Sequence, residues 1–230
     1  MTVAASAVKE WFASDCPDTS IAKLATGAGM SRVTLHQQLL RGQVPATTVV
    51  AIARSLGQLP LQTLARFDPY KDLVPSRPDS REILAFLDWP ELLVAVGQVY
   101  RNVPITEAQL GSMHFPDSSR VWVDAIDSGS IRKAVEDDLG MASSNMAAAL
   151  RTTLKLPLAV AFARAAGTPL ASAFVVADVL TPVEAGWQPD ERKEALLALD
   201  VSRLLNLVNG RSLAAEKYVR RIRQFEVDLG

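Results

Sequence analysis

The sequence has few of the features that mark secreted or membrane proteins. Its only cysteine is Cys16, so no intrachain disulfide can form and a disulfide-stapled secreted domain is excluded. Charged, glycine and proline residues interrupt its longest apolar stretch, residues 156–176, which cannot supply the roughly 18 apolar residues of a membrane span. No basic segment with an apolar core behind it opens the chain. We therefore expect a cytoplasmic protein.

The chain also lacks the residue patterns of common enzyme and metal sites. Its two histidines, His36 and His114, are far apart and do not have metal-ligand spacing. No CxxC pair, glycine-rich phosphate loop or Ser-His-Asp set is present. The sequence therefore predicts no enzyme, no metal, no cofactor and no small-molecule ligand.

An internal repeat of about 110 residues is the most informative feature that is present. Its landmarks are Ser-Ile-x-Lys at 20–23 and 130–133, Gly-Met at 29–30 and 140–141, and Ala-x-Ala-Arg at 51–54 and 161–164. The offset between the copies is 110 or 111 in these stretches, and it is 112 between residues 82–88 and 194–200. One chain therefore carries two related units.

Apolar residues in both copies recur at helical spacing, and alternating β-branched runs are few, so the sequence predicts an all-α fold. Each copy should form a five-helix domain with a helix-turn-helix motif, followed by a connector and a long apolar helix. The expected helices include 21–26, 32–41, 45–56, 131–138, 143–154, 157–166 and 169–179. The expected domains are 1–66, the connector and helix 67–117, a degenerate second helix-turn-helix domain 118–176, and a C-terminal helical segment 177–230.

The helix-turn-helix motif of the first copy points to function. Ser20 and Ser31 can cap successive helices, and Gly29 supplies the turn between them. Leu24, with Val33 or Leu35, would fill the core between the two helices. Residues 5–66 resemble the lambda-repressor-like (Cro/XRE-type) family, and most of all the immunity repressors of actinobacterial phages and prophages. Residues 118–176 resemble it more weakly.

The resemblance implies that residues 32–38 enter the major groove of double-stranded DNA. Arg32 can pair with guanine, and Gln37 and Gln38 with adenine, although one extra residue before Gly42 leaves the register of the two glutamines open. Hydroxyl and backbone N–H groups at the helix starts, with nearby cations, can hold phosphates. The implied DNA-binding set is Ser20, Lys23, Ser31, Arg32, Val33, Thr34, His36, Gln37, Gln38 and Arg41.

The second copy differs at these positions. Ser143 stands where the first copy has Arg32, and three alanines replace residues 36–38. A weaker DNA-binding set would be Ser143, Ser144, Asn145, Arg151 and Lys155. The alternative is that this copy has lost DNA binding and serves packing and dimerisation, and the sequence leaves both open.

Two further features suggest structural roles. Arg54 and Arg164 recur at the same place in both copies, where a structural role, such as an ion pair with an acid of the same copy, is expected rather than a DNA contact. The connecting helices, residues 83–99 and 196–207, have broad apolar faces. These faces should pack in the core or against each other, and an exposed dimer face is the alternative.

The charge distribution favours an anionic partner for the first copy. The whole chain carries a net charge of −1, but residues 1–66 hold six basic and three acidic residues, a net charge of +3. We therefore expect a sequence-specific, nucleoid-associated transcriptional regulator, a phage or prophage immunity repressor, acting as a monomeric pseudo-dimer or a homodimer. The alternative is a helical protein-interaction adaptor or antitoxin-like partner that does not read bases.

Overall fold

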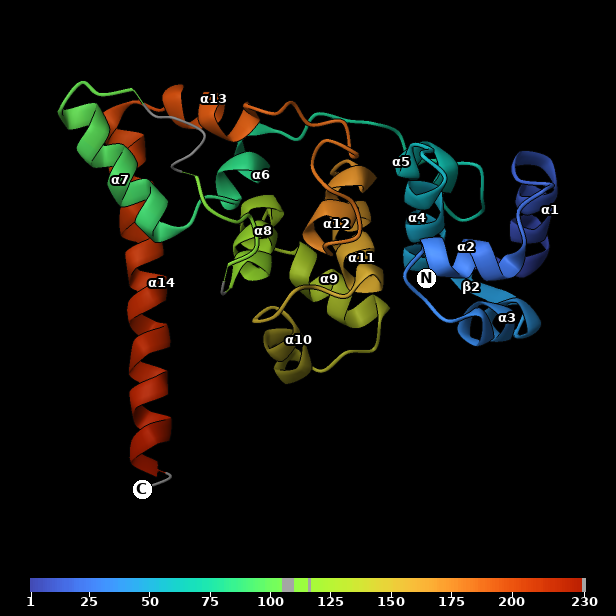
Figure 1. The fold of residues 1–230 in the computed structure, drawn as a ribbon. Coiled ribbons are helices and arrows are strands. Elements are labelled where there is room, and N and C mark those ends of the chain that lie inside the picture. Colours follow the sequence, from blue (N-terminus) through green and yellow to red (C-terminus); the bar gives the residue numbers. More distant parts are fainter. Residues whose placement is uncertain (105–109, 116, 229–230) are drawn as a thin grey trace. The chain divides into compact units, whose positions relative to one another are not determined.

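The computed structural model describes residues 1–104, 110–115 and 117–228, which form helices and one small sheet (Figure 1). The predicted all-α class is confirmed. The sheet pairs β1 (Thr2–Ala4) antiparallel with β2 (Gln43–Pro45), with Val3 opposite Val44. It ties the N-terminus to the segment that follows the predicted recognition helix, which is the helix expected over residues 32–41 to enter the major groove.

The first copy forms five helices. They are α1 (Ala5–Asp15), α2 (Ile21–Gly27), α3 (Arg32–Leu40), α4 (Ala46–Ser55) and α5 (Pro60–Leu64). The helix expected from residue 45 begins one residue later. Pro45 has extended backbone angles because it ends β2, and it serves as the N-cap of α4.

The second copy has helices at the corresponding places. They are α8 (Ser118–Ile126), α9 (Ile131–Asp138), α10 (Ser143–Ala149), α11 (Leu156–Ala166) and α12 (Leu170–Val176). The helix expected over 143–154 is shorter, because the β-branched pair Thr152-Thr153 disfavours its continuation. The Thr152 hydroxyl instead bonds to the carbonyl of Ala149 at 3.2 Å. The helix expected over 169–179 likewise ends at Val176.

Contacts group the chain into two compact units that do not follow the order of the sequence. One unit combines Met1–Pro78 with Asp127–Gln188, and the other combines Asp79–Ile126 with Pro189–Gly230. The first unit therefore holds α1–α5 and α9–α12, whereas α8 belongs to the second unit. The domain ranges expected from the sequence stay a prediction.

Within the first unit, Arg54 of α4 links the two copies. Its guanidinium donates hydrogen bonds to both carboxylate oxygens of Glu184, at 2.7 and 2.6 Å, and to the carbonyl of Val179 at 2.9 Å. Burial acts against the charge of this guanidinium, but the bond to Glu184 outweighs it and raises the pKa of Arg54. The acid belongs to the second copy, so the expected ion pair within one copy is wrong.

Arg164 of the second copy makes the corresponding contact with the first copy. Arg164 of α11 approaches Asp72 at 3.5 Å and donates to the carbonyl of Pro69 at 3.4 Å. Pro69 and Val179 are separated by 110 residues, as are Arg54 and Arg164. Each arginine therefore bonds the connector of the other copy at an equivalent position, which is the reciprocity of an isologous interface.

The two connectors also touch each other at equivalent positions. The N–H of Ser76 donates to the carbonyl of Ala185 at 3.1 Å. Gly186, the repeat equivalent of Ser76, has a φ of +96°, and a Cβ atom there would lie 2.9 Å from the Cβ of Pro75. Glycine is needed here for its backbone conformation and for this close approach.

The second unit packs α6 (Ser80–Ala85) and α7 (Trp89–Tyr100) against α13 (Glu191–Leu197) and α14 (Val201–Asp228). Its core contains the same apolar positions from both copies at an offset of 112: Leu84 and Leu196, Leu87 and Leu199, Leu92 and Leu204. The connecting helices of the two copies thus pack against each other, which is the arrangement that the sequence favoured over an exposed dimer face. Apolar residues that face one way in each repeat bury each other in a shared core.

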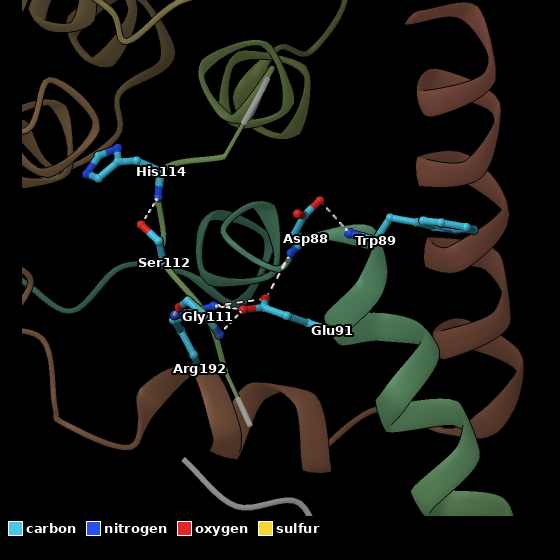
Figure 2. Close-up of polar contacts among 7 residues, drawn as sticks. All are labelled: Asp88, Trp89, Glu91, Gly111, Ser112, His114 and Arg192. Carbon is cyan, nitrogen blue, oxygen red and sulfur yellow. Dashed lines mark hydrogen bonds and ion pairs between the residues drawn. The ribbon is translucent and has the colours of Figure 1, made fainter. Parts of the chain in front are cut away.

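A buried ion pair between Glu91 and Arg192 stabilises the second unit (Figure 2). Arg192 lies 2.9 Å from both carboxylate oxygens of Glu91, and only 10% and 8% of the two side chains are exposed. Arg192 also donates to the carbonyl of Gly111 at 2.9 Å, and the N–H of Gly111 donates to Glu91. The pair therefore holds residues 110–115 against α7 and α13.

Candidate nucleic-acid interface

Local hydrogen bonds define α2, α3 and the turn between them. Ser20 accepts a bond from the N–H of Lys23 at 3.3 Å, and Ser31 accepts one from the N–H of Thr34 at 3.0 Å. Both expected N-caps are therefore confirmed. Gly29 has a φ of +68°, the left-handed conformation that the turn requires.

The packing between α2 and α3 shows which of Val33 and Leu35 fills the core, a choice that the sequence left open. Leu24 and Leu35 are buried, at 2% and 0% exposure, whereas Val33 is 63% exposed. Residues two positions apart on a helix point to nearly opposite sides, so only one of Val33 and Leu35 can face the core. Leu35 fills it, and Val33 faces outward.

The structure brings most of the predicted DNA-binding residues of the first copy to the surface. The exposed ones are Ser20, Lys23, Ser31, Arg32, Val33, Thr34, His36, Gln37 and Arg41. Gln38 is half-buried, and its side-chain oxygen is enclosed without a hydrogen-bond partner. The Thr34 hydroxyl bonds to that of Ser31 at 2.9 Å, which leaves the Thr34 methyl group for an outside contact.

The exposed side of α3 also includes a residue that the sequence reading missed. Val33, His36, Gln37 and Leu40 follow the spacing i, i+3, i+4, i+7 of a single helix face, and all four are exposed. Leu40 is 71% exposed beside the buried Leu39. This apolar residue next to a core position could have been assigned to the surface by extending the helical period one turn.

Unpaired positive charge surrounds this face. Residues 19–67 contain no Asp or Glu. Two cations of this stretch, Arg54 and Arg66, are paired with carboxylates elsewhere in the first unit. For the other three, Lys23, Arg32 and Arg41, the described part of the chain offers no ion pair. The positive potential is therefore concentrated on α2, on α3 and just beyond it.

The dimensions of α3 match a major groove. An α-helix with its side chains is about 10–12 Å in diameter and the groove is about 12 Å wide, so this nine-residue helix can lie in it. Arg32 and Gln37 are five residues apart, a rise of about 7.5 Å, which corresponds to about two base-pair steps. Hydrogen-bonding side chains at both positions could therefore contact different base pairs.

The second copy presents a different surface. Its predicted set, Ser143, Ser144, Asn145, Arg151 and Lys155, is exposed. The hydroxyl of Ser143 is engaged, however, because it donates to the carboxylate of Glu136 at 2.7 Å. The start of α10 also lacks a side-chain cap, since Ala142 stands where the first copy has Ser31.

Within the described ranges, no group of three His, Cys, Asp or Glu side chains could hold a metal ion. None of the helices in those ranges is both long and apolar enough to span a bilayer.

Searches of protein-family models, curated proteins and solved structures found nothing that matches this chain.

Proposed function

We propose that this protein is a sequence-specific transcriptional regulator that inserts α3 into the major groove of double-stranded DNA. The observation that carries the proposal is a capped, exposed helix in a stretch of 49 residues, 19–67, without an acid. Three cations of that stretch make no ion pair with any described residue. A duplex presents one phosphate charge about every 1.7 Å, so such a face gains affinity by releasing counterions.

Four exposed side chains of α3 and two nearby cations have roles in this proposal. Arg32 pairs with a guanine, and Gln37 pairs with an adenine. Val33 and Leu40 supply apolar contacts suited to thymine methyl groups. Lys23 and Arg41 contact phosphates and set the orientation of the helix without reading sequence.

The finer assignment rests on the resemblance of residues 5–66 to immunity repressors of actinobacterial phages and prophages. A repressor of that kind would occupy an operator and block transcription. It would act in the cytoplasm at the nucleoid.

A protein-interaction adaptor is the competing function, because Val33 and Leu40 expose 63% and 71% of their surface on one helix face. Such an apolar pair would also suit a protein partner. The two functions differ in their response to salt, since only DNA binding weakens steeply and regularly as salt rises.

The test is selection of bound duplexes from a random library, followed by salt titrations of the selected site. Arg32→Ala should cost about 1–3 kcal/mol and relax the preference at one base position. Lys23→Ala should weaken binding to all duplexes alike, and it should make the slope of log affinity against log salt concentration about 0.9 less steep.

Arg101→Ala is the matched control, because it removes one exposed cation from the second unit. It should change neither preference nor slope. Equal effects of Arg32→Ala and Arg101→Ala would contradict the role of α3, and no duplex binding at low salt would favour the adaptor.

A further inference from the structure

The start of α9 in the second copy already holds a negative charge. Asp127 accepts hydrogen bonds from the N–H groups of Gly129 at 2.8 Å, Ile131 at 2.9 Å and Arg132 at 3.3 Å. Burial acts to raise the pKa of Asp127, but these amides outweigh it and lower the pKa, so the carboxylate is ionised at neutral pH. Ser130 makes no side-chain cap here.

The equivalent place in the first copy is uncharged. At the offset of 110 that relates Ser20 to Ser130, Pro17 stands at the position of Asp127. The hydroxyl of Ser20 caps α2 instead. The two copies therefore use caps of different charge at the helix that precedes the recognition helix.

A second carboxylate lies beside the start of α10. Glu136 is 6% exposed and accepts the hydroxyl of Ser143 at 2.7 Å. Their equivalents in the first copy, at an offset of 111, are the buried Ala25 and the exposed Arg32. At the start of its recognition helix, the second copy thus has a serine bound to an acid where the first copy has an exposed cation.

The lysine that both copies carry in Ser-Ile-x-Lys is neutralised in the second copy as well. Lys133 is the equivalent of Lys23, and its ammonium lies 2.7 Å from the carboxylate of Asp137, one helical turn away. Lys23 makes no ion pair with any residue in the described ranges. All three differences, namely Asp127, the Lys133–Asp137 ion pair and Glu136, reduce the attraction of the second helix-turn-helix for phosphate.

We infer that Asp127 and Glu136 keep the helix-turn-helix of the second copy off the phosphate backbone, so that duplex DNA is contacted through α3 of the first copy. The inference rests on the proposed function. Amides that already donate to an internal carboxylate cannot donate to a phosphate, and the fixed negative charge repels one. The second copy then serves as a scaffold bonded to the first through Arg54 and Arg164.

The test is to neutralise both carboxylates in the full chain with Asp127→Asn and Glu136→Gln. Asparagine keeps an acceptor oxygen for the N–H groups of Gly129 and Ile131, and glutamine can still accept the Ser143 hydroxyl, so the fold is kept. Binding is measured on a random-sequence duplex of about 30 base pairs across a series of salt concentrations. We expect affinity to rise about three- to tenfold and the log–log salt slope to steepen by about 0.9 for each phosphate gained.

Asp68→Asn with Asp190→Asn is the charge-matched control, since both carboxylates are exposed and lie outside the two helix-turn-helix pairs. It should leave the slope unchanged. An equal gain in affinity in the control would show that the effect comes from net charge alone, and this would overturn the inference. No gain in affinity in the Asp127/Glu136 variant would overturn it as well.

A second measurement uses the otherwise unaltered second copy. Arg151→Ala and Lys155→Ala should leave affinity and slope as they are, and a loss in either would show that this copy already touches DNA. Failure of the proposed function looks different, because Arg32→Ala would then have no effect on duplex binding. If Arg32→Ala weakens duplex binding but the Asp127/Glu136 variant shows no gain in affinity, only the inference about the second copy is refuted, and the proposed function stands.

Discussion

The reciprocal arginines allow a prediction that the repeat alone would get wrong. Arg54 and Arg164 occupy equivalent positions, so sequence symmetry predicts equal contributions to stability. Their geometry is unequal: Arg54 makes three hydrogen bonds of 2.6–2.9 Å, whereas Arg164 makes one of 3.4 Å beside an ion pair at 3.5 Å. We expect Arg54→Ala to destabilise the protein more than Arg164→Ala.

The magnitudes follow from bonding and exposure. A hydrogen bond to a charged group contributes about 1.5–3 kcal/mol when buried, and an exposed ion pair about 0–1 kcal/mol. Arg54 and Glu184 are 43% and 19% exposed, so solvent screens part of their interaction, and we expect a loss of about 1–2 kcal/mol. Arg164 and Asp72 are 48% and 61% exposed, which limits that loss to about 0.5 kcal/mol.

The assay is equilibrium urea unfolding of the full chain and the two single variants, followed by fluorescence and circular dichroism. A double-mutant cycle of Arg54→Ala with Glu184→Ala should return a coupling energy of about 1 kcal/mol. Equal losses for Arg54→Ala and Arg164→Ala, or a coupling energy near zero, would refute the reasoning from geometry.

The same pair predicts a dependence on pH. The hydrogen bond from Arg54 lowers the pKa of Glu184 from its usual 4.5. A lowered folded-state pKa means that the stabilisation is fully present above about pH 4.5 and is lost as pH falls through the folded value. The stability difference between the wild type and Arg54→Ala should therefore shrink at acid pH, and a constant difference down to pH 2 would contradict this.

Two other predictions concern stability. Arg192→Met should cost about 3–5 kcal/mol because it leaves Glu91 buried and unpaired, and the double variant with Glu91→Gln should be less destabilised in thermal unfolding; equal losses would argue against an uncompensated charge. Ser31→Ala should cost about 1 kcal/mol in urea unfolding by removing the cap of α3, whereas Ser144→Ala, at a position without a capping bond, serves as the control and should cost little.

Features governed by neighbours in the chain were predictable from the sequence. The capping residues Ser20 and Ser31, the turn at Gly29 and the helical period of both copies depend on hydrogen bonds and backbone angles within a few residues. Exposure of Arg32 and Gln37 followed from the same period. The end of α10 was missed because the weak helix signal of Thr152-Thr153 was outweighed by the apolar pattern around it.

Contacts between distant segments were beyond the sequence. The partners of Arg54 and Arg164 lie in the other copy, 130 and 92 residues away along the chain, where many acids were equally plausible. The pair Glu91–Arg192 likewise joins residues 101 positions apart. No local pattern distinguishes an acid that will be buried beside an arginine from one that stays in water.

The sequence by itself determined the all-α class, the duplication and the candidate recognition helix of the first copy, since these depend on short-range periodicity and capping. Only the tertiary structure decided that Leu35 rather than Val33 fills the core, that the two copies exchange arginine contacts, and that Asp127 and Glu136 bond to the starts of α9 and α10 in the second copy. The reason is physical: burial and charge pairing depend on which segments meet in space, and a repeat in sequence does not specify whether its copies pack within themselves or against each other.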